Sequence, residues 1–258
     1  MTITVELTED QARAFLRASQ YLDTTGRGKG RNVTLTCFDD LMLDAVSIPI
    51  GEREWRVECV RDQGRVLAYA ESHAQAPYGL LLWESAVALA RSLHRRPTLV
   101  ANKQVLELGA GVGLPGLVAR SLGAEVWQTD HLTAALEIAR LNARANDVGG
   151  IRQFTADWAR WTDDRLYDVI LGADILYERA MQGSVVSIFD RNLAPDGFVL
   201  LADPGRQQSI DLLARLEHEG ARFDLEIAHV EPTCGLESGP LVEVVLLKGE
   251  FSAFRMVA

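Results

Sequence analysis

Cysteine, histidine and long apolar runs are scarce in this chain of 258 residues, and each scarcity excludes a class of protein. The three cysteines, Cys37, Cys59 and Cys234, are odd in number and widely spaced, which excludes a disulfide scaffold and favours reduced thiols in a cytoplasm. No CxxC or HExxH spacing occurs and the five histidines are scattered, so we expect no metal site. We also expect neither a membrane-spanning helix nor a secretory signal, because no apolar run approaches about 20 residues and no basic start precedes an apolar segment.

Basic residues are also under-represented. The chain has 26 Lys and Arg against 36 Asp and Glu, a formal charge of −10. The first 100 residues are nearly balanced, with 12 basic and 13 acidic residues, whereas the remainder has 14 and 23. An acidic body repels phosphate backbones, so we expect no nucleic-acid partner. The 48% hydrophobic content is that of a globular protein, and the length suits one full domain with an extension.

Residues 1–75 differ in pattern from the rest and are predicted to form an N-terminal α+β extension. Thr8 begins a pattern typical of a helix through Gln20. The glycine-rich basic segment Gly26–Arg31 lacks the spacing of a phosphate-binding loop and is interpreted as a surface loop. The segments Trp55–Val60 and Arg65–Ala70, separated by a turn at Gly64, are predicted to form a β-hairpin.

Residues 76–258 alternate between apolar strands and amphipathic helices, which predicts an α/β domain. We expect strands at Gln104–Leu108, Glu125–Gln128, Asp168–Gly172 and Phe198–Ala202, and helices at Gly79–His94, Leu114–Leu122, Thr133–Asn146, Gly183–Asn192 and Ser209–Glu219. The last two strands, Phe223–Val230 and Leu241–Leu247, have no helix between them and are predicted to pair antiparallel at the sheet edge. The pattern favours a Rossmann-like, doubly wound sheet, mostly parallel with an antiparallel C-terminal strand.

A glycine-rich turn follows the strand Gln104–Leu108 and carries the sharpest local signal. Gly109, Gly111 and Gly113 precede a helix whose first turn contains Pro115, an arrangement that exposes backbone amides to a ligand. The segment also satisfies the dinucleotide pattern GxGxxG, which keeps an NAD-dependent oxidoreductase as an alternative. Glu107 argues against it, because a carboxylate beside this turn would repel a pyrophosphate. A cationic ligand such as S-adenosylmethionine suits the turn better.

Three further residues follow neighbouring strands. Asp130 ends the second strand, where a carboxylate can accept both ribose hydroxyls of a nucleotide. Asp157 and Trp158 follow the expected third strand, where they could bind and cover an adenine ring. Each residue alone has a structural alternative, an exposed loop carboxylate or a core aromatic. Their register with Glu107 and the glycine turn favours a methyl-donor pocket.

These residues together resemble a class I, seven-β-strand methyltransferase, and more narrowly the family of lysine methyltransferases that modify non-histone proteins. The resemblance rests on Gly79-Leu-Leu-Leu-Trp83-Glu-Ser-Ala, the run from Leu106, Thr129-Asp130, Asp157-Trp158 and the DxxY signature Asp174-Ile-Leu-Tyr177. It implies S-adenosyl-L-methionine as cofactor and catalytic roles for Asp174 and Tyr177. The implied cofactor residues are Trp83, Glu107, Gly109, Ala110, Gly111, Gly113, Asp130, Asp157, Trp158 and Ala173.

Methyl transfer to a lysine needs a neutral amine whose lone pair faces the donor, although free lysine has a pKa of about 10.4. Asp174, at a strand end, could accept a hydrogen bond from that amine, and Tyr177 and Trp83 could wall the channel. The structural alternatives are a helix cap for Asp174, a core position for Tyr177 and ordinary helix packing for Trp83. Arg206 lies in a segment similar to methyltransferases of the electron transfer flavoprotein β subunit. Its role could be contact with an anion or a surface ion pair, and the sequence does not decide between them.

The substrate is not determined by these patterns. The first hypothesis is a lysine side chain of a partner protein, and the alternatives are a small-molecule amine with the same cofactor, NAD-dependent oxidation, or a non-catalytic binding module. Residues 1–75 match no family motif, and we expect substrate choice to lie there.

Overall fold

The structure, a computed structural model, describes residues 2–6, 32–36, 43–64, 66, 77–233 and 240–251, with the backbone alone for the first two ranges. The chain divides into two compact units, residues 1–42 and 43–258. In the first unit, strands β1 (Thr2–Glu6) and β2 (Asn32–Thr36) pair antiparallel. The helix expected at 8–20 and the basic loop at 26–31 lie outside the described residues.

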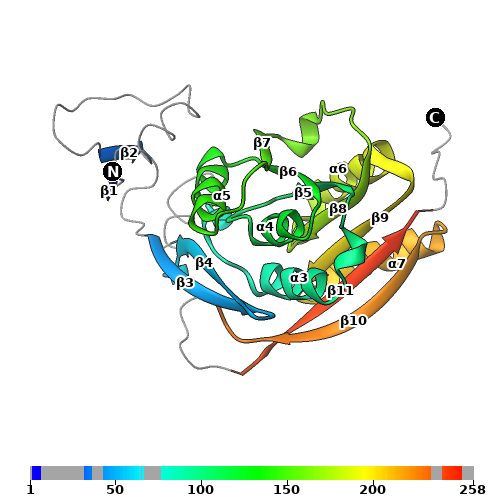
Figure 1. The fold of residues 1–258 in the computed structure, drawn as a ribbon. Coiled ribbons are helices and arrows are strands. Elements are labelled where there is room, and N and C mark those ends of the chain that lie inside the picture. The colour runs from blue at the N-terminus through cyan, green and yellow to red at the C-terminus, as the bar shows by residue number, and fades with distance from the viewer. Residues whose placement is uncertain are drawn as a thin grey trace. The chain divides into compact units, whose positions relative to one another are not determined.

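A seven-stranded sheet organises the second unit (Figure 1). In sheet order, its strands are β10 (Arg222–Val230), β11 (Val242–Glu250), β9 (Leu193–Asp203), β8 (Tyr167–Ala173), β5 (Gln104–Leu108), β6 (Glu125–Asp130) and β7 (Arg152–Thr155). The five strands from β9 to β7 are parallel, and β11 is antiparallel to both of its neighbours. The predicted fold class is therefore confirmed, including the antiparallel final strand.

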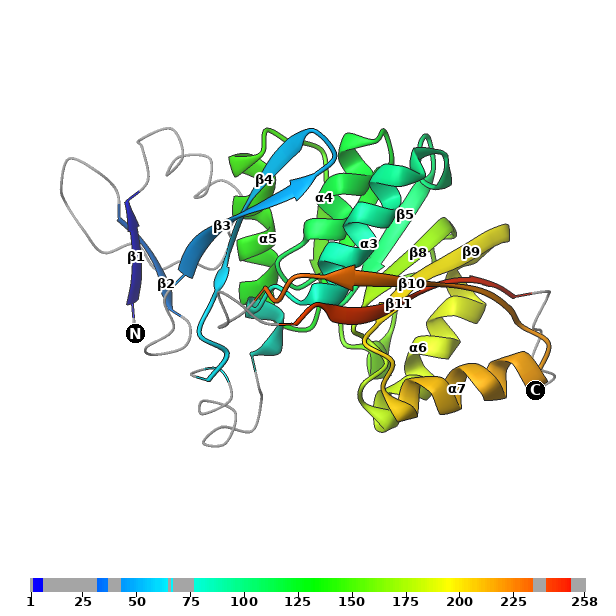
Figure 2. The ribbon, with the colours of Figure 1, turned by 90° about the horizontal axis from the view of Figure 1, so that it is seen from below.

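Helices cover both faces of the sheet, with α3, α4 and α5 on one side and α6 and α7 on the other (Figures 1 and 2). Their bounds are α3 (Glu84–Arg95), α4 (Leu114–Ser121), α5 (Thr133–Ala145), α6 (Arg179–Asn192) and α7 (Gln207–His218), with short 3₁₀ turns η1 (Tyr78–Leu80), η2 (Pro97–Leu99) and η3 (Trp158–Arg160). Within the described ranges, no helix is long and apolar enough to cross a membrane.

Burial of the strands in the core explains why their sequences are nearly continuous apolar runs. Leu106, Ile170, Val199 and Leu247, from four neighbouring strands, are at most 2% exposed and belong to one cluster. Helix residues such as Phe189 close that cluster from outside. Each such side chain contributes roughly 1.5–3 kcal/mol by leaving water. The sheet thus forms a rigid frame on which the strand-end loops are held.

Two local predictions were wrong. The helix expected from Gly79 begins at Glu84, because residues 78–80 form a 3₁₀ turn and Trp83 has an extended backbone at the N-cap. The hairpin expected between 55–60 and 65–70 pairs β4 (Arg53–Val60) with the preceding β3 (Leu43–Ile50) instead, through a turn containing Gly51. Gly51 has a φ of 63°, which glycine adopts without strain. Gln63, Gly64 and Val66 are helical, and most of the expected second strand lies outside the described residues.

The β3–β4 hairpin packs beside α5 and belongs to the same compact unit as the sheet (Figure 2). The sequence had placed the residues of both strands in the extension, with a domain boundary after residue 75. The division of the chain into an extension, residues 1–75, and a domain that carries the active site, residues 76–258, stays a prediction.

Candidate active site

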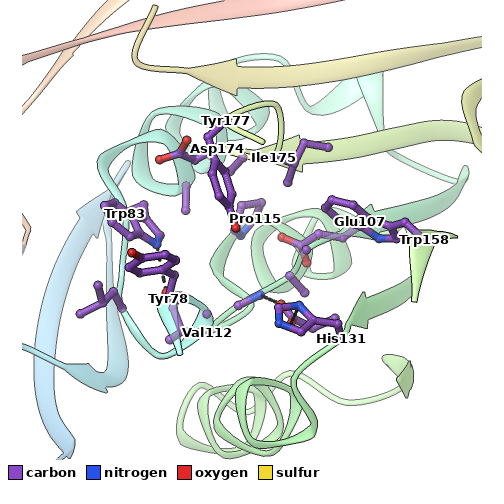
Figure 3. Close-up of a pocket in the computed structure, with 18 residues that line it drawn as sticks. Tyr78, Trp83, Glu107, Val112, Pro115, His131, Trp158, Asp174, Ile175 and Tyr177 are labelled. Carbon is purple, nitrogen blue, oxygen red and sulfur yellow. Dashed lines mark hydrogen bonds and ion pairs between the residues drawn. The ribbon is translucent and has the colours of Figure 1, made fainter. Parts of the chain in front are cut away.

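A cleft opens at the carboxyl ends of β5, β6 and β8, where ligands bind in open α/β sheets (Figure 3). It encloses about 710 Å³, counting the space that is open to solvent. We call it the strand-end cleft. It is lined by Tyr78, Gly79, Leu81, Trp83, Ala86, Glu107, Gly109, Ala110, Gly111, Val112, Pro115, Asp130, His131, Trp158, Ala173, Asp174, Ile175 and Tyr177.

The glycine turn between β5 and α4 forms the floor of this cleft. Gly109 and Gly111 have φ values of 59° and 52°, in the left-handed region that side chains disfavour. A Cβ atom on Gly111 would lie 3.2 Å from the carbonyl oxygen of Gly79. The turn is pinned at Ala110, whose amide donates to the Thr129 carbonyl at 2.8 Å. The small residues therefore keep the backbone open to a ligand.

Glu107 lies beneath the turn and is 2% exposed. Its Oε2 accepts hydrogen bonds from the Gln128 side chain at 2.8 Å and from the Gly116 amide in the first turn of α4 at 3.1 Å. Its Oε1 has no hydrogen-bond partner among the described residues, and the side chain lines the cleft (Figure 3). Burial raises the pKa of Glu107 to about 8, with Asp130 adding a smaller upward effect. A cationic ligand would favour the ionised form.

This pKa makes stability depend on pH. Between the ordinary value of 4.5 and about 8, the folded chain binds more protons at Glu107 than the unfolded chain does. The free energy of unfolding should therefore decrease as pH rises through this window, and Glu107→Gln should remove that decrease. Thermal unfolding of both proteins at pH 5.5 and 8.5 measures it, with about 2–4 °C in Tm for each kcal/mol. Parallel Tm changes in the two proteins would contradict the prediction.

Asp130 ends β6 and holds the glycine turn from the other side. Its Oδ2 accepts the Gly111 amide at 2.9 Å, and its Oδ1 accepts the Leu132 amide at 2.9 Å. Burial raises the pKa of Asp130, whereas these two amide hydrogen bonds oppose the rise. A carboxylate has about four lone-pair sites, so each oxygen keeps capacity for a ligand hydroxyl. Asp130 thus positions the turn and also lines the cleft.

Aromatic side chains wall the cleft on two sides. Trp158 comes from η3, and its Nε1 is buried without a hydrogen-bond partner among the described residues. On the opposite wall, the rings of Trp83, Tyr78 and Tyr177 meet edge to face, with centroids 6.3 Å and 6.4 Å apart. Trp83 also donates from Nε1 to the Tyr78 carbonyl at 3.1 Å, so it shapes η1 as well as the cleft.

Asp174 follows β8 and lines the cleft (Figure 3). Its φ of 56° is unusual for a residue other than glycine, and its amide donates to the Ala202 carbonyl at 2.8 Å. Its carboxylate, 7% exposed, forms a two-point ion pair with Arg206, in which the Arg206 Nη2 to Oδ2 distance is 3.1 Å. Burial raises the pKa of Asp174, and Arg206 acts in the opposite direction.

The turn after β9 holds Arg206 against Asp174. Buried Asp203 accepts at Oδ1 from the amides of Gly205 and Arg206, at 2.8 Å and 3.0 Å, and at Oδ2 from the Ser209 hydroxyl. Arg206 then begins α7 as its N-cap. The question left open for Arg206 by the sequence is thus answered as an ion pair, but one inside the site and only partly exposed.

Most of the residues expected at the site meet in one place. Two do not line the cleft: Gly113 has a φ of 86° as the N-cap of α4, and Asp157 accepts the Ala159 amide as the cap of η3. Neither structural alternative for the DxxY signature holds, since α6 begins after Glu178 and Tyr177 is 41% exposed. The sequence missed Tyr78, His131 and Ile175, which no spacing marks. It singled out Arg206 through the similar segment that follows the strand at 198–202, without assigning its partner.

The features of the strand-end cleft fit an adenosine-bearing cation. Buried carboxylates lie beneath and beside the glycine turn, the missing Cβ atoms open its backbone, and Trp158 offers an unsatisfied donor. Across the described part of the chain, no group of three or more His, Cys, Asp or Glu side chains could hold a metal ion.

Comparison with known families matches residues 62–216 to the lysine methyltransferase family. Among curated proteins, a histone-arginine methyltransferase of Xenopus laevis is 34% identical over 137 residues, 50% of this chain and 58% of the relative. The electron transfer flavoprotein β subunit lysine methyltransferase of Danio rerio is 30% identical over 165 residues, 63% of this chain and 64% of the relative. The chain thus spans less than two thirds of these relatives.

A solved structure shares the fold. Precorrin-6y C5,15-methyltransferase from Geobacter metallireducens superposes with a TM-score of 0.51 at 16% identity, covering 64% of this chain and 86% of that one.

Proposed function

The chain belongs to the lysine methyltransferase family, and from that premise we propose that it transfers a methyl group from S-adenosylmethionine to a lysine side chain of a partner protein. The observation that carries the proposal is the carboxylate of Asp174, whose side chain is 7% exposed and lines the same cleft as the glycine turn and Glu107. An acceptor amine and a cationic donor would therefore meet between acidic groups. The zebrafish relative, named for a lysine substrate, supports this acceptor.

The cofactor is assigned to the glycine-turn side of the strand-end cleft. When bound, S-adenosylmethionine supplies an electrophilic methyl group on a positively charged sulfur. Gly109, Ala110 and Gly111 would contact it through the backbone, and Glu107 and Asp130 would balance its charge and bind its hydroxyls. The remaining wall residues proposed for it are Trp83, Trp158 and Ala173. We assign Gly113 and Asp157 indirect roles, through the turn and through the placement of Trp158.

Asp174 and Tyr177 are assigned to the acceptor amine. A carboxylate that lines the cleft can accept a hydrogen bond from the amine and orient its lone pair for in-line attack. Tyr177, partly exposed beside Tyr78, would line the approach of the side chain and favour positive charge over its ring. Arg206 opposes the rise that burial causes in the pKa of Asp174 and so helps keep the carboxylate an acceptor rather than a donor.

Arginine is the second candidate acceptor, because the Xenopus relative is named for it. A substrate guanidinium would need the two-point face of the Asp174 carboxylate, which Arg206 already occupies. An amine N–H needs only one lone pair of a carboxylate oxygen as its acceptor, and the Asp174 carboxylate retains such lone pairs beside Arg206. This occupancy favours lysine.

The partner is proposed to be a protein, with the cytoplasm as the compartment, consistent with the few widely spaced cysteines. The acidic excess after residue 100 would attract a cationic lysine segment and disfavour nucleic acid. Residues 1–75 are proposed to contribute to the choice of partner.

The proposal is tested by incubating the protein with methyl-labelled S-adenosylmethionine and a lysate of cells that lack its gene. We expect a labelled protein band that yields methyl-lysine on hydrolysis. Methyl-arginine would transfer the assignment to the second acceptor, and label confined to small molecules would indicate a metabolite amine. The proposal would be contradicted if no label entered the lysate and the protein also failed to bind S-adenosylhomocysteine, the form of the cofactor that remains after methyl transfer.

A further inference from the structure

Two asparagines, Asn142 in α5 and Asn146 at its C-cap, hold the outer edge of strand β4. Asn142 accepts the Glu58 amide at 2.7 Å and donates to the Glu58 carbonyl at 3.1 Å. One helical turn later, Asn146 accepts the Arg56 amide at 3.0 Å and donates to the Arg56 carbonyl at 2.7 Å. Both residues are at most 5% exposed.

These contacts replace a neighbouring strand. In an antiparallel pair, alternate residues turn both backbone groups away from the partner, and Arg56 and Glu58 turn theirs from β3 toward α5. A side-chain amide offers the same donor and acceptor pair as a peptide group. The spacing of four residues along α5 matches the spacing of two along β4, so both amides fit in register.

The two asparagines differ in one hydrogen bond. The second Nδ2 hydrogen of Asn146 goes to the Asn142 carbonyl at 2.8 Å, within α5 itself. The second Nδ2 hydrogen of Asn142 goes to the Val112 carbonyl at 2.9 Å. Val112 belongs to the glycine turn and lines the strand-end cleft. The Asn142 side chain therefore joins the hairpin to the glycine turn, whereas the Asn146 side chain joins the hairpin only to α5.

We propose that Asn142 is a positioning residue that couples the β3–β4 hairpin to the glycine turn and so sets the affinity for the cofactor. This rests on the proposed function, since it presumes that the turn binds S-adenosylmethionine. The hairpin precedes the segment that matches the family, residues 62–216, so the coupling extends the cofactor site beyond that segment. Losing Asn142 would leave the Val112 carbonyl without its donor and free the turn to move.

The test compares Asn142→Ala with Asn146→Ala by calorimetric titration of S-adenosylhomocysteine and by thermal unfolding without ligand. Both variants should lower Tm to a similar degree, because each loses the clamp on β4. Asn142→Ala should weaken binding about tenfold, within the range of ordinary coupling energies, and Asn146→Ala should bind as the wild type does. Equal affinities in the two variants would overturn the proposal. A wild-type protein that binds no S-adenosylhomocysteine would overturn the proposed function instead.

A second measurement needs only the wild-type protein. Coupling is reciprocal, so S-adenosylhomocysteine should in turn steady β4. Amide hydrogen exchange at Arg56 and Glu58 should slow on adding S-adenosylhomocysteine, relative to the amides of α7, which covers the other face of the sheet. Protection confined to the glycine turn, with exchange in β4 unchanged, would contradict the coupling even if the Asn142 variant cannot be purified.

Discussion

Asp174→Asn is expected to reduce methyl transfer by about 100- to 1,000-fold while cofactor binding stays near the wild-type value. Asparagine tolerates the left-handed backbone at this position and has nearly the same shape. The substitution removes the negative charge that attracts the amine. It also replaces one of the two acceptor oxygens by an amide nitrogen. Label incorporation into the lysate acceptor measures the first effect, and titration with S-adenosylhomocysteine measures the second.

Glu178→Gln is the matched control for this prediction. Glu178 is exposed, lies four residues along the chain and does not line the strand-end cleft. Its replacement removes the same unit of charge near the site without touching the acceptor position. Transfer should remain close to wild type. A comparable loss in both variants would assign the effect to the general acidic field, and a loss of cofactor affinity in Asp174→Asn would reassign the residue to the cofactor.

Gly111→Arg is expected to weaken S-adenosylhomocysteine binding by at least about 100-fold. The side chain would enter the strand-end cleft, its Cβ would lie 3.2 Å from the Gly79 carbonyl oxygen, and the left-handed backbone would cost about 1–2 kcal/mol. Calorimetric titration measures the loss, and circular dichroism verifies that the variant folds.

Gly123→Arg is the control for the glycine substitution. Gly123 has a φ of 94°, and no heavy atom beyond its chain neighbours lies within 4 Å of a Cβ placed there. The variant therefore carries the same kind of backbone strain outside the strand-end cleft and should bind the ligand normally. Unchanged affinity in Gly111→Arg would refute the cofactor assignment of the turn.

The parallel sheet and its strand-end residues could be predicted because the signals are local. A buried parallel strand is a nearly continuous apolar run, and the residue that ends it reaches the same edge as its neighbours. Glu107, Asp130 and Asp174 were placed by this rule, and all three line the strand-end cleft. The hairpin was mispaired because β4 has an apolar segment on either side, and a turn with Gly51 competes with one at Gly64.

The sequence alone determined the order of strands and helices, through the periodicity of its apolar residues. It also determined the glycine turn and the carboxylates beside it, through their positions at strand ends. The tertiary structure decided which distant side chains complete them: Arg206 on Asp174, Tyr78 against Tyr177, and Asn142 between Glu58 and Val112. These pairs join residues that are 30 to 99 positions apart in the chain. No spacing encodes such pairs, because their distances depend on how several packed elements and their side-chain conformations come together in the folded core.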